Sequence, residues 1–193
     1  MAETTIIQCP HCHAKNRVPA SRGEQAARCG RCHKPLAPDQ NASGDTRAFT
    51  LRCAQCRTKN RVPAAKLHAG AKCGRCGAVL SHRDVDTGRT VMVTDANFDQ
   101  TVLQSPLPVL LYAWAPWCSV CSSVSPQVDQ LANETKGRVR VGKVNVETNP
   151  GLASKYNVLS VPAFIIFDAG QFKEHLTGGI PKPDLKMKMA AYI

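Results

Sequence analysis

Trp117-Cys118-Ser119-Val120-Cys121 sets the architecture of the second half of this 193-residue chain. The motif follows a continuous apolar run at residues 109–113, which is typical of a strand buried on both faces. The sequence after it predicts a long helix over residues 118–134. A Cys-x-x-Cys between a buried strand and a helix indicates reversible dithiol–disulfide exchange, so the motif predicts a reaction as well as a fold.

Strands and helices are predicted to alternate through residues 90–193. The first elements are a strand at 91–93, a helix at 97–104 with Asp95 as its N-cap, and, after the motif, a strand at 139–146. A helix at 150–156, a hairpin of strands at 163–167 and 172–176, and a closing helix at 181–192 complete the pattern. This alternation predicts an α/β domain.

Eight further cysteines lie upstream in two matched sets. Each set has the spacing Cys-x2-Cys-x16-Cys-x2-Cys, and the second set begins 44 positions after the first. Residues 15–20, Lys-Asn-Arg-Val-Pro-Ala, recur unchanged at 59–64, so the sets are an internal duplication. The predicted metal ligands are Cys9, Cys12, Cys29 and Cys32 in the first copy and Cys53, Cys56, Cys73 and Cys76 in the second.

The cysteine spacing predicts structural zinc sites. Two residues between cysteines let a tight turn direct both sulfur atoms to one point, and two such knuckles complete a tetrahedron around Zn²⁺. Four thiolates leave no open position, so we expect two structural zinc ions, although iron is also accepted by all-sulfur sites. His11 and His13 flank the first knuckle, but Gln55 and Arg57 stand at the matching places of the second copy, which favours an outer position for both histidines.

Positive charge is concentrated in the cysteine-rich part. Residues 1–83 hold 15 Lys and Arg against 4 Asp and Glu, whereas residues 84–193 hold 10 of each, so the net charge of +11 belongs to the first 83 residues. Such a segment can attract nucleic acid, anionic lipid or acidic proteins, or it can simply be a well-solvated surface. Nucleic acid is therefore a partner to be tested.

The N-terminal residues and the hydropathy pattern predict a cytoplasmic protein. Residues 1–8 lack the basic start and long apolar core of a secretory signal. No apolar run approaches the roughly 18–20 residues that span a bilayer, so no membrane partner is expected. In a reducing cytoplasm, paired Cys-x-x-Cys motifs indicate metal or catalytic sites rather than structural disulfides.

Residues 90–193 resemble a complete thioredoxin. The matching pieces are residues 113–118 (Ala-Trp-Ala-Pro-Trp-Cys), Pro126, residues 143–145 (Lys-Val-Asn), 149–150 (Asn-Pro), 155–156 (Lys-Tyr) and 161–162 (Val-Pro), and Gly178. The four-cysteine modules resemble zinc ribbons, and the zinc-bearing thioredoxins of the thioredoxin-2 type carry one such module where this chain has two. The resemblance implies an α/β thioredoxin fold, a mixed central sheet flanked by helices, preceded by two small four-cysteine zinc ribbons.

The predicted domain boundaries follow from these pieces. They are zinc ribbon 1 at 1–36, a linker at 37–48, zinc ribbon 2 at 49–80, a second linker at 81–89, and a thioredoxin-like redox domain at 90–193. Because the linkers are rich in turn-forming residues, both ribbons are expected to move relative to the redox domain.

The resemblance also implies a mechanism. It makes the protein a thiol–disulfide oxidoreductase that reduces or exchanges disulfides of protein substrates and is reduced by an NADPH-dependent thioredoxin reductase. Cys118 would be the attacking thiol, its pKa lowered by the helix N-terminus, and Cys121 would resolve the mixed disulfide. Val161-Pro162 would form a cis-proline loop, although a trans proline at a sheet edge is the alternative. Trp117, Val161, Pro162 and Gly178 would line the substrate groove.

The sequence departs from the family pattern in two places. Ser119-Val120 replaces the usual Gly-Pro between the cysteines, and Tyr112 replaces a buried aspartate that assists proton transfer at the resolving cysteine. Lys143 matches a family lysine that sits near that aspartate; otherwise it would only extend its amine to solvent. Tyr112 and Lys143 are therefore predicted supporting residues.

Three functions remain open from the sequence. The first is the oxidoreductase, with the ribbons as a docking or redox-sensing head. The second is a zinc-ribbon module that binds a protein or nucleic acid. The third is a redox-switched holdase, in which oxidation ejects zinc and the unfolded ribbons bind client proteins. The intact Cys118–Cys121 pair favours the first.

Overall fold

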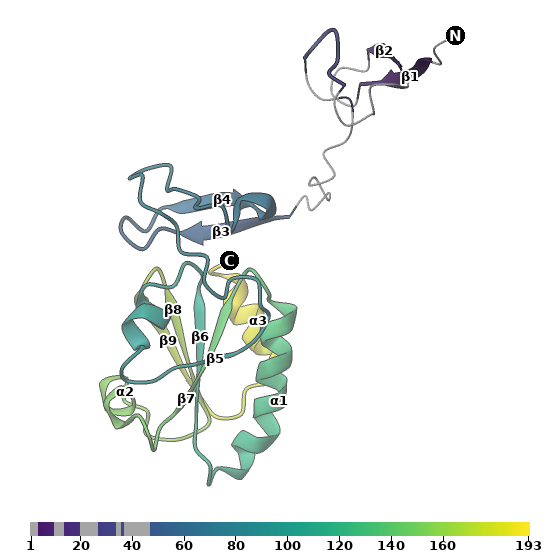
Figure 1. Cartoon of the computed structure of the whole chain (residues 1–193). Coiled ribbons are helices and arrows are strands. Elements are labelled where there is room, and N and C mark those ends of the chain that lie inside the picture. Colours follow the sequence, from purple (N-terminus) through teal and green to yellow (C-terminus); the bar gives the residue numbers. More distant parts are fainter. Residues whose placement is uncertain (1–3, 10–13, 20–26, 34–35, 37–46) are drawn as a thin grey trace. The chain divides into compact units, whose positions relative to one another are not determined.

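The computed structural model describes residues 4–9, 14–19, 27–33, 36 and 47–193. The chain forms two compact units, Met1–Thr46 and Arg47–Ile193. The first unit holds ribbon 1, and the second holds ribbon 2 together with the redox domain (Figure 1). The predicted domain boundaries remain a prediction.

Ribbon 1 is built on a two-stranded sheet. Strand β1 (Thr4–Gln8) pairs antiparallel with β2 (Lys15–Pro19). Cys9, Val18, Cys29 and Leu36 form a small buried cluster. The core formed by the described residues of ribbon 1 is small, so a metal bound by the cysteines would add folding free energy. Cys12, His11 and His13 lie outside the described residues.

Ribbon 2 repeats this sheet. Strand β3 (Ala48–Arg52) pairs with β4 (Lys59–Pro63) in the register Ala48↔Pro63 to Arg52↔Lys59, which is the register of ribbon 1 shifted by 44 positions. A single 3₁₀ turn, η2 (Ala64–Lys66), follows β4. The sequence duplication is therefore also a structural duplication.

The redox domain has the predicted mixed sheet. Its strands are β5 (Val91–Met92), β6 (Val109–Trp114), β7 (Arg140–Asn145), β8 (Ala163–Asp168) and β9 (Gln171–Thr177). They lie in the order β5-β7-β6-β8-β9, with β7 parallel to β5 and β6, and β8 antiparallel to β6 and β9. The fold prediction is confirmed.

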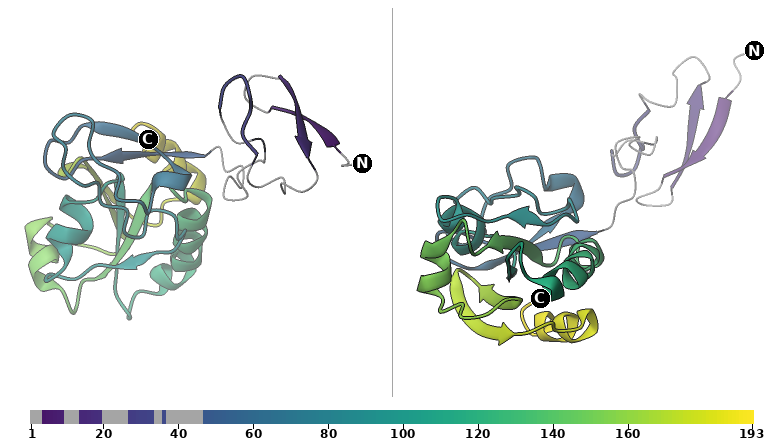
Figure 2. Two further views of the ribbon diagram at one scale, coloured as in Figure 1. Left: turned by 45° about the horizontal axis from the view of Figure 1, so that its top comes forward. Right: turned by 90° about the horizontal axis from the view of Figure 1, so that it is seen from below.

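Helices cover both faces of this sheet. On one face, α1 (Ser119–Glu134) and α3 (Lys182–Ala190) pack on Leu110 and Tyr112 of β6. On the other, α2 (Pro150–Lys155) and the π-helical turn η3 (Asp99–Leu103) pack on the alternate residues of β6 (Figure 2). Successive side chains of a strand point to opposite faces, so a strand covered on both must be apolar throughout, as residues 109–113 are.

Asp95 caps a different helix from the one predicted. Its two carboxylate oxygens accept hydrogen bonds from the amides of Gly151 and Leu152, in the first turn of α2. Before η3, Thr94 and Asn97 instead bond to each other: the backbone amide of each donates a hydrogen bond to the side-chain oxygen of the other. The sequence identified a capping residue correctly, but its long-range partner could not be read from local spacing.

The segment at 81–89 packs on the redox domain. Val85 is buried, and its carbonyl accepts a hydrogen bond from the amide of Gly137 at 3.0 Å. The carbonyl of Arg83 accepts one from the guanidinium of the buried Arg140. This segment therefore contacts the redox domain, and ribbon 2 belongs to the same compact unit, so the expected movement of ribbon 2 stays a prediction.

None of the helices within the described residues combines the length and hydrophobicity needed to cross a bilayer.

Candidate functional site

Cys118 and Cys121 lie at the N-terminal end of α1. Cys118 is the N-cap of the helix and Cys121 is in its first turn, with their Cα atoms 5.2 Å apart and their sulfur atoms joined as a disulfide. The amide of Cys121 donates a hydrogen bond to the Cys118 sulfur at 3.1 Å. The helix end therefore offers an amide donor and a positive dipole to a thiolate at Cys118.

The loop before β8 faces Cys118. The Val161–Pro162 peptide bond is cis, as predicted. The Val161 carbonyl oxygen lies 3.6 Å from the Cys118 sulfur, and the Pro162 carbonyl accepts a hydrogen bond from the amide of Gly178. The structure thus brings three of the four predicted groove residues together beside the first cysteine.

Exposed apolar side chains accompany the cysteine pair. Trp117, next to Cys118, is 67% exposed, and Val120, between the cysteines, is 51% exposed. A Cβ atom on Gly179 would lie 3.3 Å from Val120, so the chain after Gly178 passes close to the cysteine pair. Exposed apolar residues around a redox-active pair suit contact with a polypeptide.

The four cysteines of ribbon 2 form one cluster. Their sulfur atoms all lie within 4.8 Å of one another. The sulfurs of Cys53 and Cys76 are 3.6 Å apart, and those of Cys56 and Cys73 are 3.5 Å apart. Zinc–sulfur bonds of about 2.3 Å in a tetrahedron place sulfurs about 3.8 Å apart, so the donor set fits a zinc ion.

In ribbon 1, three described cysteines form a comparable cluster. The sulfurs of Cys9, Cys29 and Cys32 lie within 4.8 Å of one another, with Cys9 and Cys32 at 3.6 Å. Cys12, the fourth predicted ligand, lies outside the described residues. Three thiolates already fit a tetrahedral metal site with one further ligand.

With this geometry established, comparison with known proteins identifies the family. The thioredoxin family model matches residues 89–191. The chain belongs to the thioredoxin family. The model described as the N-terminal part of thioredoxin 2, a zinc ribbon, matches residues 8–34 and again residues 52–78, so the predicted zinc-ribbon-bearing, thioredoxin-2-like organisation with a duplicated ribbon is confirmed.

Several thioredoxins are similar to the redox domain. Thioredoxin from Synechocystis sp. (strain ATCC 27184 / PCC 6803 / Kazusa) is 41% identical over 104 residues, which cover 54% of this chain and 97% of that protein. Thioredoxin 1 from Nostoc sp. (strain PCC 7120 / SAG 25.82 / UTEX 2576) is 42% identical over 101 residues, or 52% and 94% of the two chains. This thioredoxin is accordingly a thiol–disulfide oxidoreductase.

Tyr112 fills the place beneath the cysteine pair of this thioredoxin. The side chain is fully buried, stacks on Phe164 at 5.2 Å between ring centroids, and donates a hydrogen bond to the Cys121 carbonyl at 3.0 Å. Burial, with the negative charge of Asp129 as a smaller cause, raises the pKa of Tyr112 to about 12. Its hydroxyl therefore stays protonated at neutral pH and cannot accept a proton from Cys121.

Lys143 finds an acidic partner on α1. Its Nζ lies 2.7 Å from Asp129 Oδ1 and donates a hydrogen bond to Ser125 Oγ at 2.9 Å. The lysine side chain is only 12% exposed, so its ammonium is held in this pair instead of extending freely to solvent. Sequence reasoning missed Asp129, although its spacing of four from Ser125 places both on one face of α1.

An asparagine supports the cysteine cluster in each ribbon of this thioredoxin. Asn60 Nδ2 donates to the Thr58 carbonyl at 2.8 Å and toward the Cys73 sulfur at 3.6 Å, and its Oδ1 accepts from the Gly74 amide at 2.9 Å. Asn16 makes the same three contacts, at the same distances, with Ala14, Cys29 and Gly30. Sequence reasoning missed both asparagines, although each lies in the segment repeated unchanged.

Proposed function

We propose that this thioredoxin reduces or exchanges disulfides of cytoplasmic protein substrates through the Cys118–Cys121 dithiol. The observation that carries the proposal is the position of Cys118, at the N-terminus of α1 and 3.6 Å from the carbonyl oxygen of the cis-proline loop. This places a potential thiolate beside backbone groups that an extended substrate can contact.

The reaction consists of two exchange steps. The Cys118 thiolate attacks one sulfur of the substrate disulfide, forms a mixed disulfide and releases the other substrate sulfur as a thiolate. Cys121, after losing its proton, attacks the Cys118 sulfur, which closes the Cys118–Cys121 disulfide and releases the second substrate thiolate. The two electrons come from the dithiol, and a NADPH-dependent thioredoxin reductase restores it.

Hydrogen bonding and the helix dipole support the first step. Each stabilises the Cys118 thiolate relative to the thiol, and the Cys121 amide is already directed at that sulfur. Cys121 is more deeply buried than Cys118, which suits a resolving thiol that substrate does not reach directly.

An extended polypeptide fits the groove. The backbone around Val161 and Pro162 can pair with a substrate strand, in the manner of strand addition. Gly178, which has no side chain, bonds to the Pro162 carbonyl, and Trp117, directly before Cys118 in the chain, offers a broad exposed apolar surface. Sequence-tolerant binding is expected, because main-chain contacts carry most of the recognition.

The second step lacks the family's buried acid. Tyr112 keeps its proton, and the described carboxylate nearest to Lys143 is the half-exposed Asp129, already paired with that lysine. We therefore expect resolution by Cys121 to be slower at neutral pH than in thioredoxins with the aspartate, and to rise with pH.

The ribbons each hold one structural zinc ion in this proposal. Ribbon 2 would use Cys53, Cys56, Cys73 and Cys76, and ribbon 1 would use Cys9, Cys12, Cys29 and Cys32. Zinc supplies the folding free energy that these small cores lack. With four thiolate ligands each site is closed, so it takes no part in the exchange reaction.

Disulfide reduction by the purified protein tests the proposal. Insulin, thioredoxin reductase and NADPH should support turnover by the intact chain, measured as NADPH oxidation. Turnover should persist in a fragment starting at Arg47, the beginning of the second compact unit. Absence of turnover in both, with folded and fully reduced protein, would contradict the assignment.

Charge favours a second candidate function, binding of nucleic acid by ribbon 2. Residues 47–83 contain nine Lys and Arg and no Asp or Glu, and Lys59, Arg61 and Arg75 are exposed. Phosphate contacts release counterions, so binding of this kind must weaken steeply as salt rises. Fluorescence anisotropy with a labelled oligonucleotide from 20 to 200 mM salt tests it, and no binding at the lowest salt would exclude it.

A further inference from the structure

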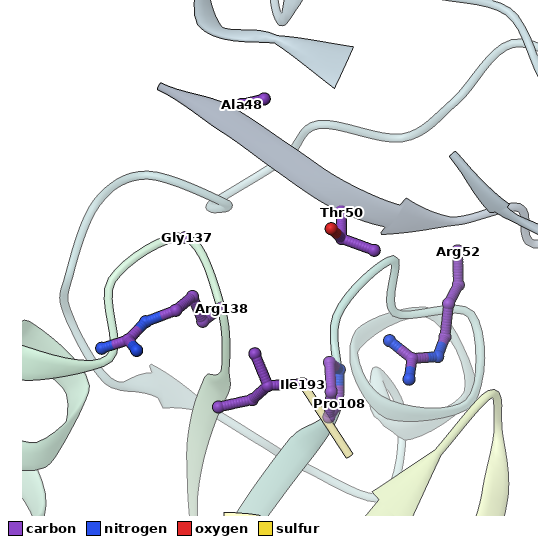
Figure 3. Close-up of a pocket in the computed structure, with 7 residues that line it drawn as sticks. All are labelled: Ala48, Thr50, Arg52, Pro108, Gly137, Arg138 and Ile193. Atoms are coloured by element: carbon purple, nitrogen blue, oxygen red, sulfur yellow. The ribbon is translucent and has the colours of Figure 1, made fainter. Parts of the chain in front are cut away.

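Arg52 joins ribbon 2 to the redox domain. The residue is 4% exposed, its Nη2 lies 2.7 Å from Asp168 Oδ1, and the same group donates to the Tyr192 carbonyl at 2.7 Å. Its backbone amide donates to the Pro106 carbonyl at 2.7 Å. Figure 3 shows the Arg52 and Thr50 side chains directed from β3 toward Pro108 and the C-terminal residue. Through its buried guanidinium and its backbone amide together, Arg52 ties three segments of the redox domain to one strand.

Apolar packing accompanies these polar contacts. Leu107 of the redox domain belongs to the buried cluster that also contains Phe49, Leu51 and Leu80 of ribbon 2. The Phe49 ring lies so close to Gly137 that a Cβ atom there would be 2.5 Å from a ring carbon. The two parts therefore share one apolar core, with a cavity of about 160 Å³ beside it (Figure 3).

This interface lies at the end of the sheet away from the cysteine pair. Pro106 and Leu107 precede the start of β6, and Asp168 ends the antiparallel β8, whereas Cys118 follows the end of β6. Figure 1 shows β3 and β4 beside the end of the sheet where β6 begins. Ribbon 2 is therefore placed to stabilise the redox domain and not to contact a substrate disulfide held at Cys118.

The two ribbons differ at the docking positions and agree at the metal. Counting back 44 positions, ribbon 1 has glutamine in place of Arg52, threonine in place of Phe49 and histidine in place of Arg57. Arg57 is a docking residue because its guanidinium donates to the Leu103 carbonyl at 2.8 Å. By contrast, the cysteines, the supporting asparagine and the glycine it binds are identical in both copies. The same metal site has thus been kept while the docking side chains have changed.

We infer that ribbon 2 is a structural part of the redox domain, fastened by Arg52, and that the metal in ribbon 2, but not the metal in ribbon 1, sets the stability of the redox domain. Without metal, ribbon 2 cannot keep β3 folded. Leu107 then loses its apolar neighbours, and Asp168 loses the cation that compensates its charge. The inference concerns folding, so it does not depend on the proposed disulfide exchange.

The two ribbons provide matched test variants. Both tryptophans, Trp114 and Trp117, lie in the redox domain, so tryptophan fluorescence reports on that domain alone. Cys53→Ser with Cys56→Ser should lower its melting temperature by roughly 5–10 °C, a readable shift for a domain of this size. Cys9→Ser with Cys12→Ser should leave it within about 1 °C of wild type. Equal shifts from the two pairs, or none from the first, would overturn the inference.

A second pair of variants leaves all cysteines in place. Arg52→Gln inserts the residue that ribbon 1 carries, whereas Lys59→Gln removes the same charge from the partner position on β4, where the lysine is exposed. Both should retain the wild-type zinc content by elemental analysis. Only Arg52→Gln should lower the fluorescence melting temperature and speed amide hydrogen exchange at Ser105, at Leu107 and at residues 137–140. Identical behaviour of the two variants would refute the role of Arg52.

Discussion

The chain uses the spacing Cys-x-x-Cys in two ways, and the difference lies in the residue after the second cysteine. In ribbon 2, Arg57 and Gly77 adopt positive φ values of 60° and 72°, and their amides bond back to the carbonyls of Cys53 and Cys73. In the redox domain, the residue after the second cysteine is Ser122, which lies within α1 and has helical geometry. The same spacing therefore closes a metal-binding knuckle in one place and starts a helix in the other.

The number of nearby sulfur atoms separates the two chemistries further. Each ribbon-2 pair meets a second pair within 4.8 Å, so a metal ion can be shared by four thiolates. The sulfur of Cys118 instead faces the Val161 carbonyl, which leaves its dithiol to exchange with a substrate. Spacing alone predicts a tight approach of two sulfurs, and the surroundings decide whether metal or disulfide results.

The largest expected effect separates the two thiols of the redox pair. Cys118→Ser should reduce insulin-disulfide turnover to the background rate, because no attacking thiol remains. Cys121→Ser should still attack but remain bound to substrate as a mixed disulfide, visible by non-reducing electrophoresis. Ser119→Ala is the control and should turn over normally. Trapping by Cys118→Ser and normal turnover by Cys121→Ser would reverse the assignment.

The metal-binding pairs should respond independently of the redox pair. We expect Cys73→Ser to lower the zinc content from two ions per chain to one, while Cys118→Ser keeps both. Elemental analysis of reduced, desalted protein measures this directly. Loss of zinc from the Cys118 variant would show that the two kinds of pair are not separate.

A smaller effect should come from the asparagine beside the metal ligands. Asn60→Ala removes the hydrogen bonds to the Gly74 amide and the Cys73 sulfur, and loss of such an outer contact lowers metal affinity by about 10–100-fold. Competition with a chromophoric chelator measures the affinity. Lys59→Gln, one residue earlier, should leave it unchanged. An affinity equal to wild type in Asn60→Ala would remove the supporting role.

The smallest effect concerns the proton on Cys121. In the proposed metal sites of the ribbons a metal would replace the thiol protons, whereas Cys121 must lose its proton without a metal. Tyr112→Asp should speed release of the mixed disulfide by about tenfold near pH 7, which is below the roughly 10²–10⁴-fold that an optimally placed general base contributes. The wild-type rate should rise with pH as Cys121 ionises, and the variant should reach its plateau at lower pH. Stopped-flow tryptophan fluorescence follows release.

Tyr112→Phe is the matched control for this prediction. It keeps the ring on Phe164 and removes only the hydroxyl bonded to Cys121, so release should not accelerate. A folded Tyr112→Asp protein with an unchanged rate would show that the missing acid does not limit resolution.

Much of this organisation was predictable from local sequence. The motif around Cys118, the repeated cysteine spacing and Val161-Pro162 correctly predicted the fold, the clustering of the cysteines described in ribbon 2 and the cis peptide bond. The cysteine clusters follow from a strict repeat, whereas the complete fold and the cis peptide bond were expected from the resemblance to thioredoxins. The roles of the individual site residues remain predictions that the variants above test.

Contacts between distant segments were not predictable. Asp95 meets residues more than 50 positions away, Lys143 finds Asp129 across the helix–sheet interface, and Arg52 pairs with a residue at the end of β8. A charged residue on a short strand is predicted to be solvent-exposed, because the sequence does not show which surface the strand packs against. Arg52 differs from its counterpart in ribbon 1, but the sequence gives no reason for the difference. The structure gives the reason, because it shows Arg52 paired with Asp168.

Arg57 performs two tasks that favour different residues. Its positive φ is a conformation that glycine adopts at no steric cost, as Gly77 does at the other knuckle, and that an L-residue adopts at roughly 1–2 kcal/mol. Its side chain, however, reaches the Leu103 carbonyl, which glycine could not do. Arginine at this position therefore makes the turn at its cysteine pair less favourable than glycine would, but it adds a hydrogen bond to the redox domain. The docking contact of Arg57 is therefore made at a position where glycine would form the cysteine turn with less strain.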